Sequence, residues 1–270
     1  MNQFPLDPSE NLSPLTNLGH LPDGIQAIRA RTPARILVGR AGPAYRTATQ
    51  LELRKDHAAA LDAVHADLDL LKDFGREFVE RWRLFEVSSQ ASGKTEYLMR
   101  PDLGRRLHEA GRQQVIRLCP PKAHLQVVIG DGLSAAAVVA QVPRLLPLLE
   151  DEARSRGWTF GQPFVVRYCR VGILNDIGDA LDFEVIVLLI GERPGLATAL
   201  SLSAYLAYRP RVGHTDAQRN LISNIHDRGV LPQFAAKRII SLADKMRELG
   251  TSGVSVKEEF CVSDTIRRLE

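Results

Sequence analysis

The sequence predicts an α/β protein with an open, mainly parallel, Rossmann-like sheet flanked by helices and preceded by a helical N-terminal region. The prediction rests on three apolar runs, at 125–129, 163–168 and 185–190, each followed by a polar or glycine-containing turn. Runs that are apolar on both faces are typical of strands in a parallel sheet that helices cover on both sides. Helical segments separate the three runs, as connected βαβ units require.

The first part of the chain is expected to be mainly helical. Apolar residues recur at helical spacing over 47–71, and a second helix is predicted around 103–118, ended by the two prolines that follow it. Short extended pieces are expected at 36–38 and 84–87. Residues 1–20 contain prolines among polar residues without a sustained hydrophobic period, so we interpret them as a flexible arm.

Two further helices are predicted in the second part of the chain. One begins at Ser134 and ends near Gly157, and the other runs from Pro232 to Leu249 with Gly250 as its stop signal. The expected organisation is therefore a flexible N-terminal arm at 1–20, a mainly helical region at 21–120, a ligand-contacting α/β domain at 121–250 and a C-terminal tail at 251–270.

The composition of the 270-residue chain argues against several classes of function. Lys and Arg total 35 against 32 acidic residues, a balance that does not favour nucleic acid as a partner. No apolar run approaches the roughly 20 residues of a membrane span, so no membrane segment is expected. The three cysteines lie far apart and the seven histidines are scattered, so neither a disulfide framework nor a metal site is predicted. A reducing cytoplasm is the expected location.

The loops that follow the three predicted strands are candidates for ligand contact. They are 130–132, 168–171 and 191–195. Right-handed crossovers would place these strand exits at one edge of the sheet, where open α/β sheets bind ligands. In the last loop, Glu192 could accept hydrogen bonds and Arg193 could donate them, or the two side chains could pair with each other.

The first of these loops contains a glycine pattern with two interpretations. Residues 130–135 match G-x-G-x-x-A, which either brings backbone N–H groups against a phosphate or forms a tight strand-to-helix turn with Ser134 as N-cap. A dinucleotide site also needs an acidic residue at the end of the second strand, whereas Glu150 and Asp151 lie inside the predicted helix. The hypothesis of a dinucleotide-dependent oxidoreductase therefore lacks its second support.

Expectations for four other polar or reactive residues follow from their spacing and their neighbours in the sequence. Arg167 and Arg170 are expected on the same side while their strand persists. Cys169 is interpreted as a small buried hydrophobe, because no histidine pattern accompanies it. His226 is expected in a polar loop at 224–226, as a hydrogen-bond donor. From these residues alone, the chain is a ligand-binding α/β domain whose ligand is unnamed.

Six segments share their residues with motifs of one known family: GRAGP at 39–43, RPDLGRRL at 100–107, VVIGDGLS at 127–134, VRYCRV at 166–171, GERPGL at 191–196 and ISNIH at 222–226. Through these segments the chain resembles the small (light) subunit of ethanolamine ammonia-lyase. They follow the family's order and nearly its spacing, and the similarity covers about residues 20–250. Several motifs that agree together are far more specific than any one of them.

The resemblance implies an adenosylcobalamin-dependent lyase of ethanolamine catabolism, which forms acetaldehyde and ammonia by a radical mechanism. A large-subunit partner, built as a barrel, would hold ethanolamine, and this chain would cover part of the corrin ring in a higher-order hetero-oligomer. The implied cofactor-binding residues are Val171, Glu192 and Leu221, and no catalytic residue is assigned to this chain. The family often has cysteine at the third position, so a role of that sulfur does not transfer to Leu221.

The resemblance also implies that the shared cofactor binds in the base-on mode. Cobalamin proteins that replace the lower base with histidine carry D-x-H-x-x-G, and no histidine here follows an aspartate by two positions. The cytoplasmic location leaves open whether a bacterial microcompartment encloses the enzyme, and the stoichiometry is open as well. A non-catalytic structural subunit is the alternative hypothesis.

Overall fold

The computed structural model of the chain describes residues 23–31, 36, 38, 40–195 and 198–258. The predicted arm at 1–20 and the last part of the predicted tail, 259–270, lie outside these residues. Leu37 also lies outside them. The other two residues of the extended piece predicted at 36–38, Ile36 and Val38, belong to no strand.

The chain forms two compact units, Met1–Arg46 and Thr47–Glu270. The described part of the first unit contains α1 (Asp23–Ala30) and a small hairpin of β1 (Arg40–Ala41) and β2 (Ala44–Tyr45). All other elements, and the candidate site, belong to the second unit.

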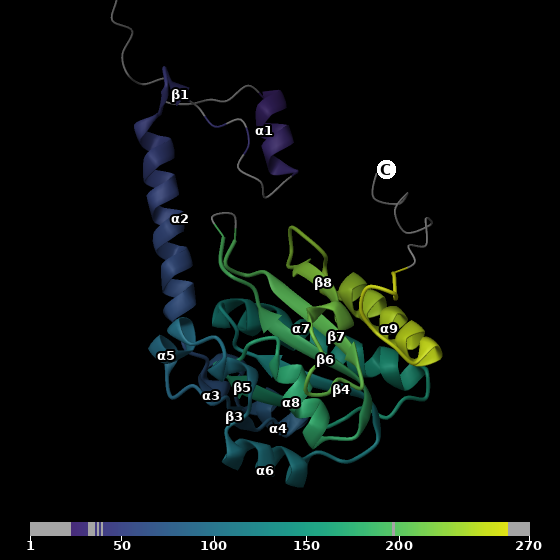
Figure 1. Cartoon of the computed structure of the whole chain (residues 1–270). Helices are drawn as coiled ribbons and strands as arrows, with labels where there is room; N and C mark the ends of the chain where they lie inside the picture. The colour runs from purple at the N-terminus through teal and green to yellow at the C-terminus, as the bar shows by residue number, and fades with distance from the viewer. Residues whose placement is uncertain (1–22, 32–35, 37, 39, 196–197, 259–270) are drawn as a thin grey trace, which may run out of the picture. The chain divides into compact units, whose positions relative to one another are not determined.

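Six strands of the second unit form a mixed sheet in the order β3-β5-β4-β6-β7-β8 (Figure 1). The first four in this order pair in parallel, whereas β7 and β8 pair antiparallel. The α/β class is confirmed, but the Rossmann-like arrangement is not, because the chain returns through two antiparallel strands after β6. The strands are β3 (Glu86–Ser88), β4 (Ala123–Gly130), β5 (Phe164–Arg167), β6 (Phe183–Gly191), β7 (Leu202–Tyr208) and β8 (Asn220–Ile225).

Most of the predicted helical segments are helical in the structure. The segment predicted at 47–71 is interrupted after His65, because the side chain of Asp69 caps a new helix. The segment predicted around 103–118 consists of a 3₁₀ turn and a helix, and Ser134 caps α7 as expected. The elements are α2 (Thr47–His65), α3 (Leu70–Phe74), α4 (Arg76–Trp82), α5 (Lys94–Met99), η1 (Leu103–Arg105), α6 (Glu109–Leu118), α7 (Ala135–Ser155), α8 (Ile173–Ala180), η2 (Asp216–Gln218) and α9 (Pro232–Leu249).

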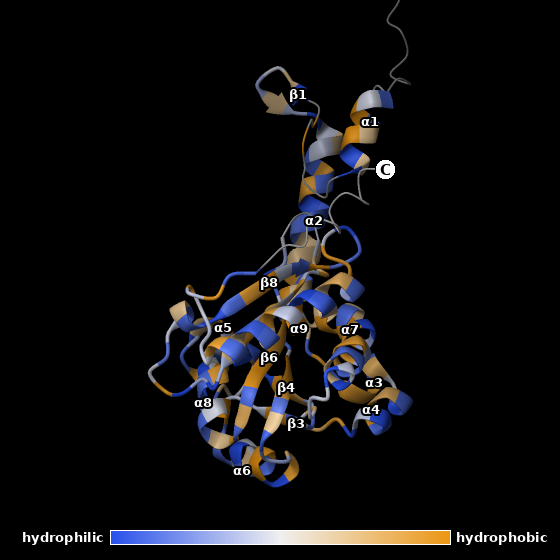
Figure 2. Cartoon of the chain, turned by 90° about the vertical axis from the view of Figure 1, so that its right-hand side faces the viewer, coloured by the Kyte–Doolittle hydropathy of each residue, from blue (hydrophilic) through white to orange (hydrophobic). Residues whose placement is uncertain are grey.

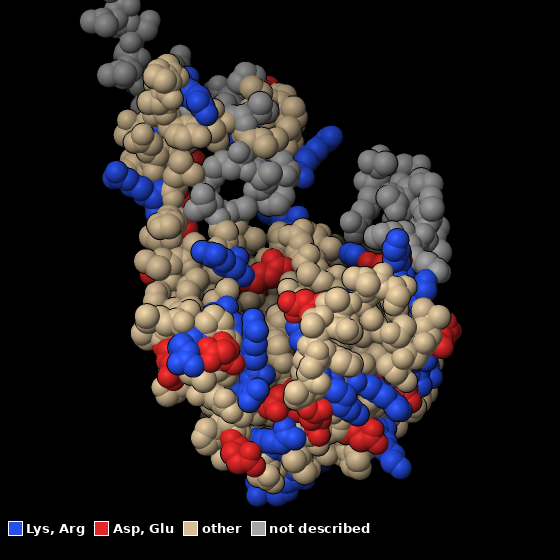
Figure 3. All heavy atoms as spheres, viewed as in Figure 1, with Lys and Arg blue, Asp and Glu red and all other residues tan. Residues whose placement is uncertain are grey.

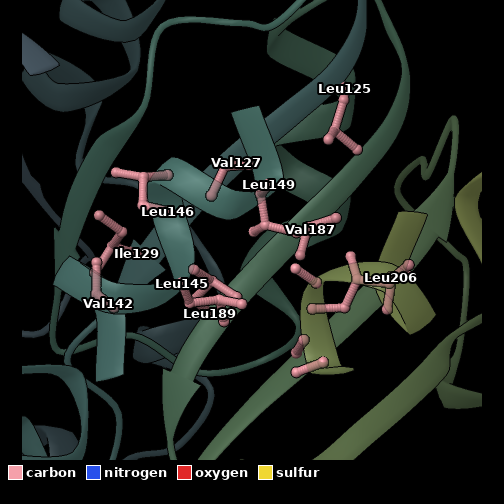
Figure 4. Packing of buried hydrophobic residues seen from close by; sticks show 14 of the residues in the cluster. Leu125, Val127, Ile129, Val142, Leu145, Leu146, Leu149, Val187, Leu189 and Leu206 are labelled. Carbon is pink, nitrogen blue, oxygen red and sulfur yellow. The ribbon is translucent and has the colours of Figure 1, made fainter. Parts of the chain in front are cut away.

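Helices cover both faces of the sheet around β4 and β6. On β6, Val187 and Leu189 pack into a core with α7 and α9, whereas Ile186 and Leu188 pack into a second core with α6 and α8. Figure 4 shows the first core, in which Leu145 and its neighbours on α7 lie against the strands. Figure 2 shows central strands coloured mainly as hydrophobic. Burial on both faces explains the continuous apolar sequence of β6.

The edge strand β8 is covered on one face only. Ile222 and Ile225 of β8 are buried in the core that contains α9. On the opposite face of β8, Leu221 is 46% exposed and Ser223 is exposed as well. This uncovered face forms the floor of the candidate site described below.

Two further properties concern the described residues as a whole. None of their helices combines the length and the apolar character that a bilayer crossing requires. Within the same part of the chain, no three or more His, Cys, Asp or Glu side chains gather as metal ligands would.

Figure 3 shows Lys and Arg side chains interspersed with Asp and Glu over the visible face.

Candidate functional site

A hollow of about 310 Å³ lies at the edge where β4, β5 and β6 end. Its walls include Val171, from the turn after β5, and Glu192, from the turn after β6. Its floor includes Tyr205 and Leu221, which are paired neighbours on β7 and β8. The structure thus brings together all three residues for which a cofactor contact is predicted, and their role toward a cofactor stays a prediction.

The buried side chain of Asp131 holds the turn after β5 in position. Its carboxylate accepts hydrogen bonds from the backbone N–H groups of Tyr168, at 2.8 Å, and Cys169, at 2.9 Å. Tyr168 has a φ of 54°, a left-handed conformation that needs such support in a non-glycine residue. Burial raises the pKa of Asp131, and these N–H groups and the Lys94 ammonium oppose the rise. Asp131 is therefore a positioning residue for Val171.

The glycine turn at 130–135 packs against the end of β6. The Leu133 N–H donates a hydrogen bond to the Gly191 carbonyl at 3.1 Å. Gly132 has a φ of 58°, and a Cβ on it would lie 2.5 Å from the same carbonyl oxygen, so only glycine fits. This geometry favours the tight-turn interpretation over a dinucleotide site, because the backbone of β6 fills the space through which a pyrophosphate would approach the glycine.

The Glu192 carboxylate is anchored through one oxygen and open at the other. Its Oε1 accepts hydrogen bonds from the Ser203 hydroxyl, at 2.7 Å, and the Asn224 N–H, at 2.8 Å. Within the described residues its Oε2 has no donor, and no ion pair joins it to Arg193. Since a carboxylate accepts several hydrogen bonds, Oε2 can receive an amide or hydroxyl group of a ligand.

The prediction of a polar loop at 224–226 is wrong for Asn224 and Ile225, because both belong to β8. His226 Nδ1 accepts the Arg228 N–H at 3.2 Å, so in the neutral ring Nε2 carries the proton and donates to the Asn224 Oδ1 at 2.7 Å. Burial lowers the pKa of His226, although the nearby Glu192 opposes this effect. His226 therefore holds Asn224, and Asn224 in turn holds Glu192.

Arg167 and Arg170 contact different parts of the molecule, so the prediction that they share a side is wrong: residues three positions apart lie on opposite faces of a strand. β5 ends at Arg167, and the left-handed residue that follows redirects the chain. Arg167 forms ion pairs with Asp67 and Glu86, each at 3.6 Å, whereas Arg170 lines the hollow.

Sequence reasoning missed two aromatic residues of the hollow. The buried Tyr97 donates a hydrogen bond from its hydroxyl to the Cys169 carbonyl at 3.0 Å. Cys169 itself is fully buried, as predicted, and burial raises the pKa of its thiol well above the ordinary value. Tyr205 is half-buried, and burial raises its pKa as well. The alternation of apolar residues over 202–206 is the signal that would have predicted β7, and with it Tyr205.

A sequence model of the ethanolamine ammonia-lyase light chain matches residues 22–257, which include every residue of the hollow. This chain belongs to the ethanolamine ammonia-lyase light-chain family. The light chain is accordingly a subunit of a lyase.

Three relatives, each named ethanolamine ammonia-lyase small subunit, are similar to this light chain over most of its length. The Clostridium perfringens protein is 40% identical over 230 residues, which are 85% of this chain and 76% of the relative. The Fusobacterium nucleatum subsp. nucleatum protein is 41% identical over 229 residues, with the same shares of 85% and 76%. The Clostridium acetobutylicum protein is 37% identical over 233 residues, or 86% of this chain and 94% of the relative.

Proposed function

We propose that this light chain is the small subunit of an adenosylcobalamin-dependent ethanolamine ammonia-lyase and that its hollow covers part of the corrin ring. One observation carries the proposal: Val171, Glu192 and Leu221, which come from three separate elements, border the same hollow. When bound, the cofactor supplies the radical chemistry that converts ethanolamine to acetaldehyde and ammonia. The large subunit would hold ethanolamine and the residues that handle protons, in a cytoplasmic hetero-oligomer.

The size of the hollow fits one edge of a corrinoid. Its volume of about 310 Å³ is at the lower end of the roughly 300–1,000 Å³ of pockets that enclose drug-sized ligands. A cobalamin is larger than such ligands, so this hollow is suited to contact part of it while a second polypeptide encloses the rest.

The chemistry of the lining also fits a corrinoid. The partly buried Val171 and the exposed Leu221 offer apolar contact to the hydrocarbon edge of the ring. The open Oε2 of Glu192 is an acceptor for the amide groups of the ring or for a ribose hydroxyl. These residues would orient the cofactor and exclude water from it, and the lower base would stay on the cobalt.

Co-expression with the large subunit tests this function. The purified complex is titrated with cobalamin, and the absorbance spectrum gives its affinity. We expect Glu192→Ala to weaken binding by roughly tenfold, because a charge-assisted hydrogen bond is lost. The matched control is Glu77→Ala, since Glu77 is an exposed glutamate on α4. A wild-type complex that forms but binds no cobalamin contradicts the proposal.

A purely structural subunit is the second candidate, and the hydrogen bonds of Glu192 favour it. Through Oε1, Glu192 ties the exit of β6 to Ser203 and Asn224. Glu192→Gln separates the two hypotheses, because glutamine keeps one acceptor for these donors and replaces the open oxygen with an NH₂ group. A cofactor contact predicts weaker cobalamin binding with little change in stability. A structural role predicts unchanged affinity.

A further inference from the structure

A second cleft, of about 520 Å³, adjoins the hollow and shares Arg170 and Val171 with it. Its walls come from residues 101–106, from residues 170–176 at the start of α8, and from residues 212–219. We call this space the arginine cleft, after the four arginines that line it: Arg105, Arg106, Arg170 and Arg219.

Two aspartates also line the arginine cleft, but cations already neutralise both of them. Asp176 forms an ion pair with Arg112 at 2.8 Å, and the Asp216 carboxylate pairs with Arg219. In the described part of the chain, the guanidinium groups of Arg105 and Arg106 have neither a hydrogen bond nor an ion pair. The cleft therefore carries an excess of positive charge.

The remaining arginine of the cleft also lacks an anionic partner. The Arg170 guanidinium donates to the Tyr97 carbonyl at 3.2 Å and lies 4.3 Å from the centre of the Tyr97 ring. Its Nε is buried without an acceptor among the described residues, and so is the Nε of Arg219, whose side chain is only 6% exposed. Guanidinium groups without an anionic partner favour a ligand that is rich in acceptor oxygens.

Close packing holds these arginines in place. The Arg170 N–H donates to the Gly104 carbonyl at 2.8 Å, and a Cβ on Gly104 would lie 2.6 Å from the Arg170 side chain. A Cβ on Gly172 would lie 2.8 Å from the stem of Arg105. The stems of Arg105 and Arg170 thus pack against neighbouring backbone, which restricts their conformations.

We propose that the arginine cleft is the subsite for the phosphate group that joins a side chain of the corrin ring to the nucleoside of the cofactor. This inference rests on the function proposed above and specifies which part of the cofactor this chain recognises. Guanidinium groups present paired N–H donors that match phosphate oxygens, and they keep their charge at any physiological pH. The cleft and the hollow share a wall at Arg170 and Val171, so one ligand can contact both.

A carboxylate of the large subunit is the other anion that could enter the cleft. The phosphate is favoured because the arginines line a concave space continuous with the hollow, and not a convex patch of the surface. The experiment distinguishes the two anions.

The test compares three corrinoids on the assembled complex of both subunits: cobalamin, cobinamide phosphate and cobinamide. The second keeps the phosphate without the nucleoside, and the third lacks both. We expect Arg105→Gln/Arg106→Gln to weaken binding of the two phosphate-bearing corrinoids by at least about tenfold and to leave cobinamide unchanged. Arg76→Gln/Arg117→Gln is the matched control, because both arginines are exposed and lie outside the cleft.

Each other outcome overturns the inference in a distinct way. An equal loss for all three corrinoids shows a contact with the ring or a structural change, and a loss for cobalamin alone shows a contact with the nucleoside. Unchanged affinities together with weaker subunit association, measured by light scattering, show that the arginines pair with the large subunit. If the wild-type complex binds no corrinoid, the proposed function itself fails.

Discussion

The central strand β6 and the edge strand β8 differ in how helices cover them. On β6, consecutive residues alternate between two cores, and every one from Val185 to Leu189 is fully buried. On β8, only one face is buried, and Leu221 on the other face is 46% exposed. The difference teaches that the central strands supply stability, whereas the edge strand β8 offers an open surface on which a ligand can lie.

The largest expected effect contrasts a core leucine with a leucine of the open face. Leu188→Ala should lower the free energy of unfolding by about 2–5 kcal/mol, because it leaves a cavity in a fully buried position. Leu221→Ala should change it by no more than about 0.5 kcal/mol. Urea unfolding of the purified chain measures both values. Similar losses for the two variants would break the comparison.

The next effect concerns the turn that carries Val171. Asp131→Asn should lower the free energy of unfolding by about 1–3 kcal/mol, because the amide cannot accept both the Tyr168 and the Cys169 N–H groups with two oxygens. Asp151→Asn, at an exposed position of α7, is the control and should be neutral. A neutral Asp131→Asn would show that the turn does not depend on this carboxylate.

The third prediction uses pH to test how the open face is supported. Because the folded state lowers the pKa of His226 below its ordinary 6.5, the unfolded chain binds this proton more readily. Stability contributed by His226 should therefore be lost as the pH falls through about 6.5. His226→Gln should flatten this dependence, and His57→Gln, at an exposed position of α2, should not. Urea unfolding at pH 7.5 and pH 5.5 makes the measurement, and parallel profiles for wild type and His226→Gln would refute the prediction.

The smallest effect is expected at Leu221, where the family often has cysteine. Leu221→Cys keeps a small apolar side chain on the open face, so cobalamin affinity of the complex should change by about threefold or less. Leu221→Asp is the informative partner variant, because it adds a charge to the same surface and should weaken binding more strongly. If Leu221→Cys strengthens binding by tenfold or more, the sulfur makes a specific contact.

Much of the site could be predicted, but by resemblance and not from local pattern. Val171, Glu192 and Leu221 were named from motifs, and the structure brings them to one hollow. The support for these residues could not be predicted, because Asp131 and Asn224 act across the fold. Asp131 bonds residues 37 and 38 positions away, and Asn224 bonds a carboxylate 32 positions away.

The sequence by itself determined the elements whose signals are local. β4 and β6 are continuous apolar runs, and α7 and α9 carry their caps and their apolar periods within the segment, so each was predictable from its own residues. Only the tertiary structure decided that β7 and β8 return antiparallel, that one face of β8 stays open, and that four arginines from three separate segments line one cleft. The physical reason is distance along the chain: a helix period or a cap is written in consecutive residues, whereas a shared wall depends on how remote segments pack.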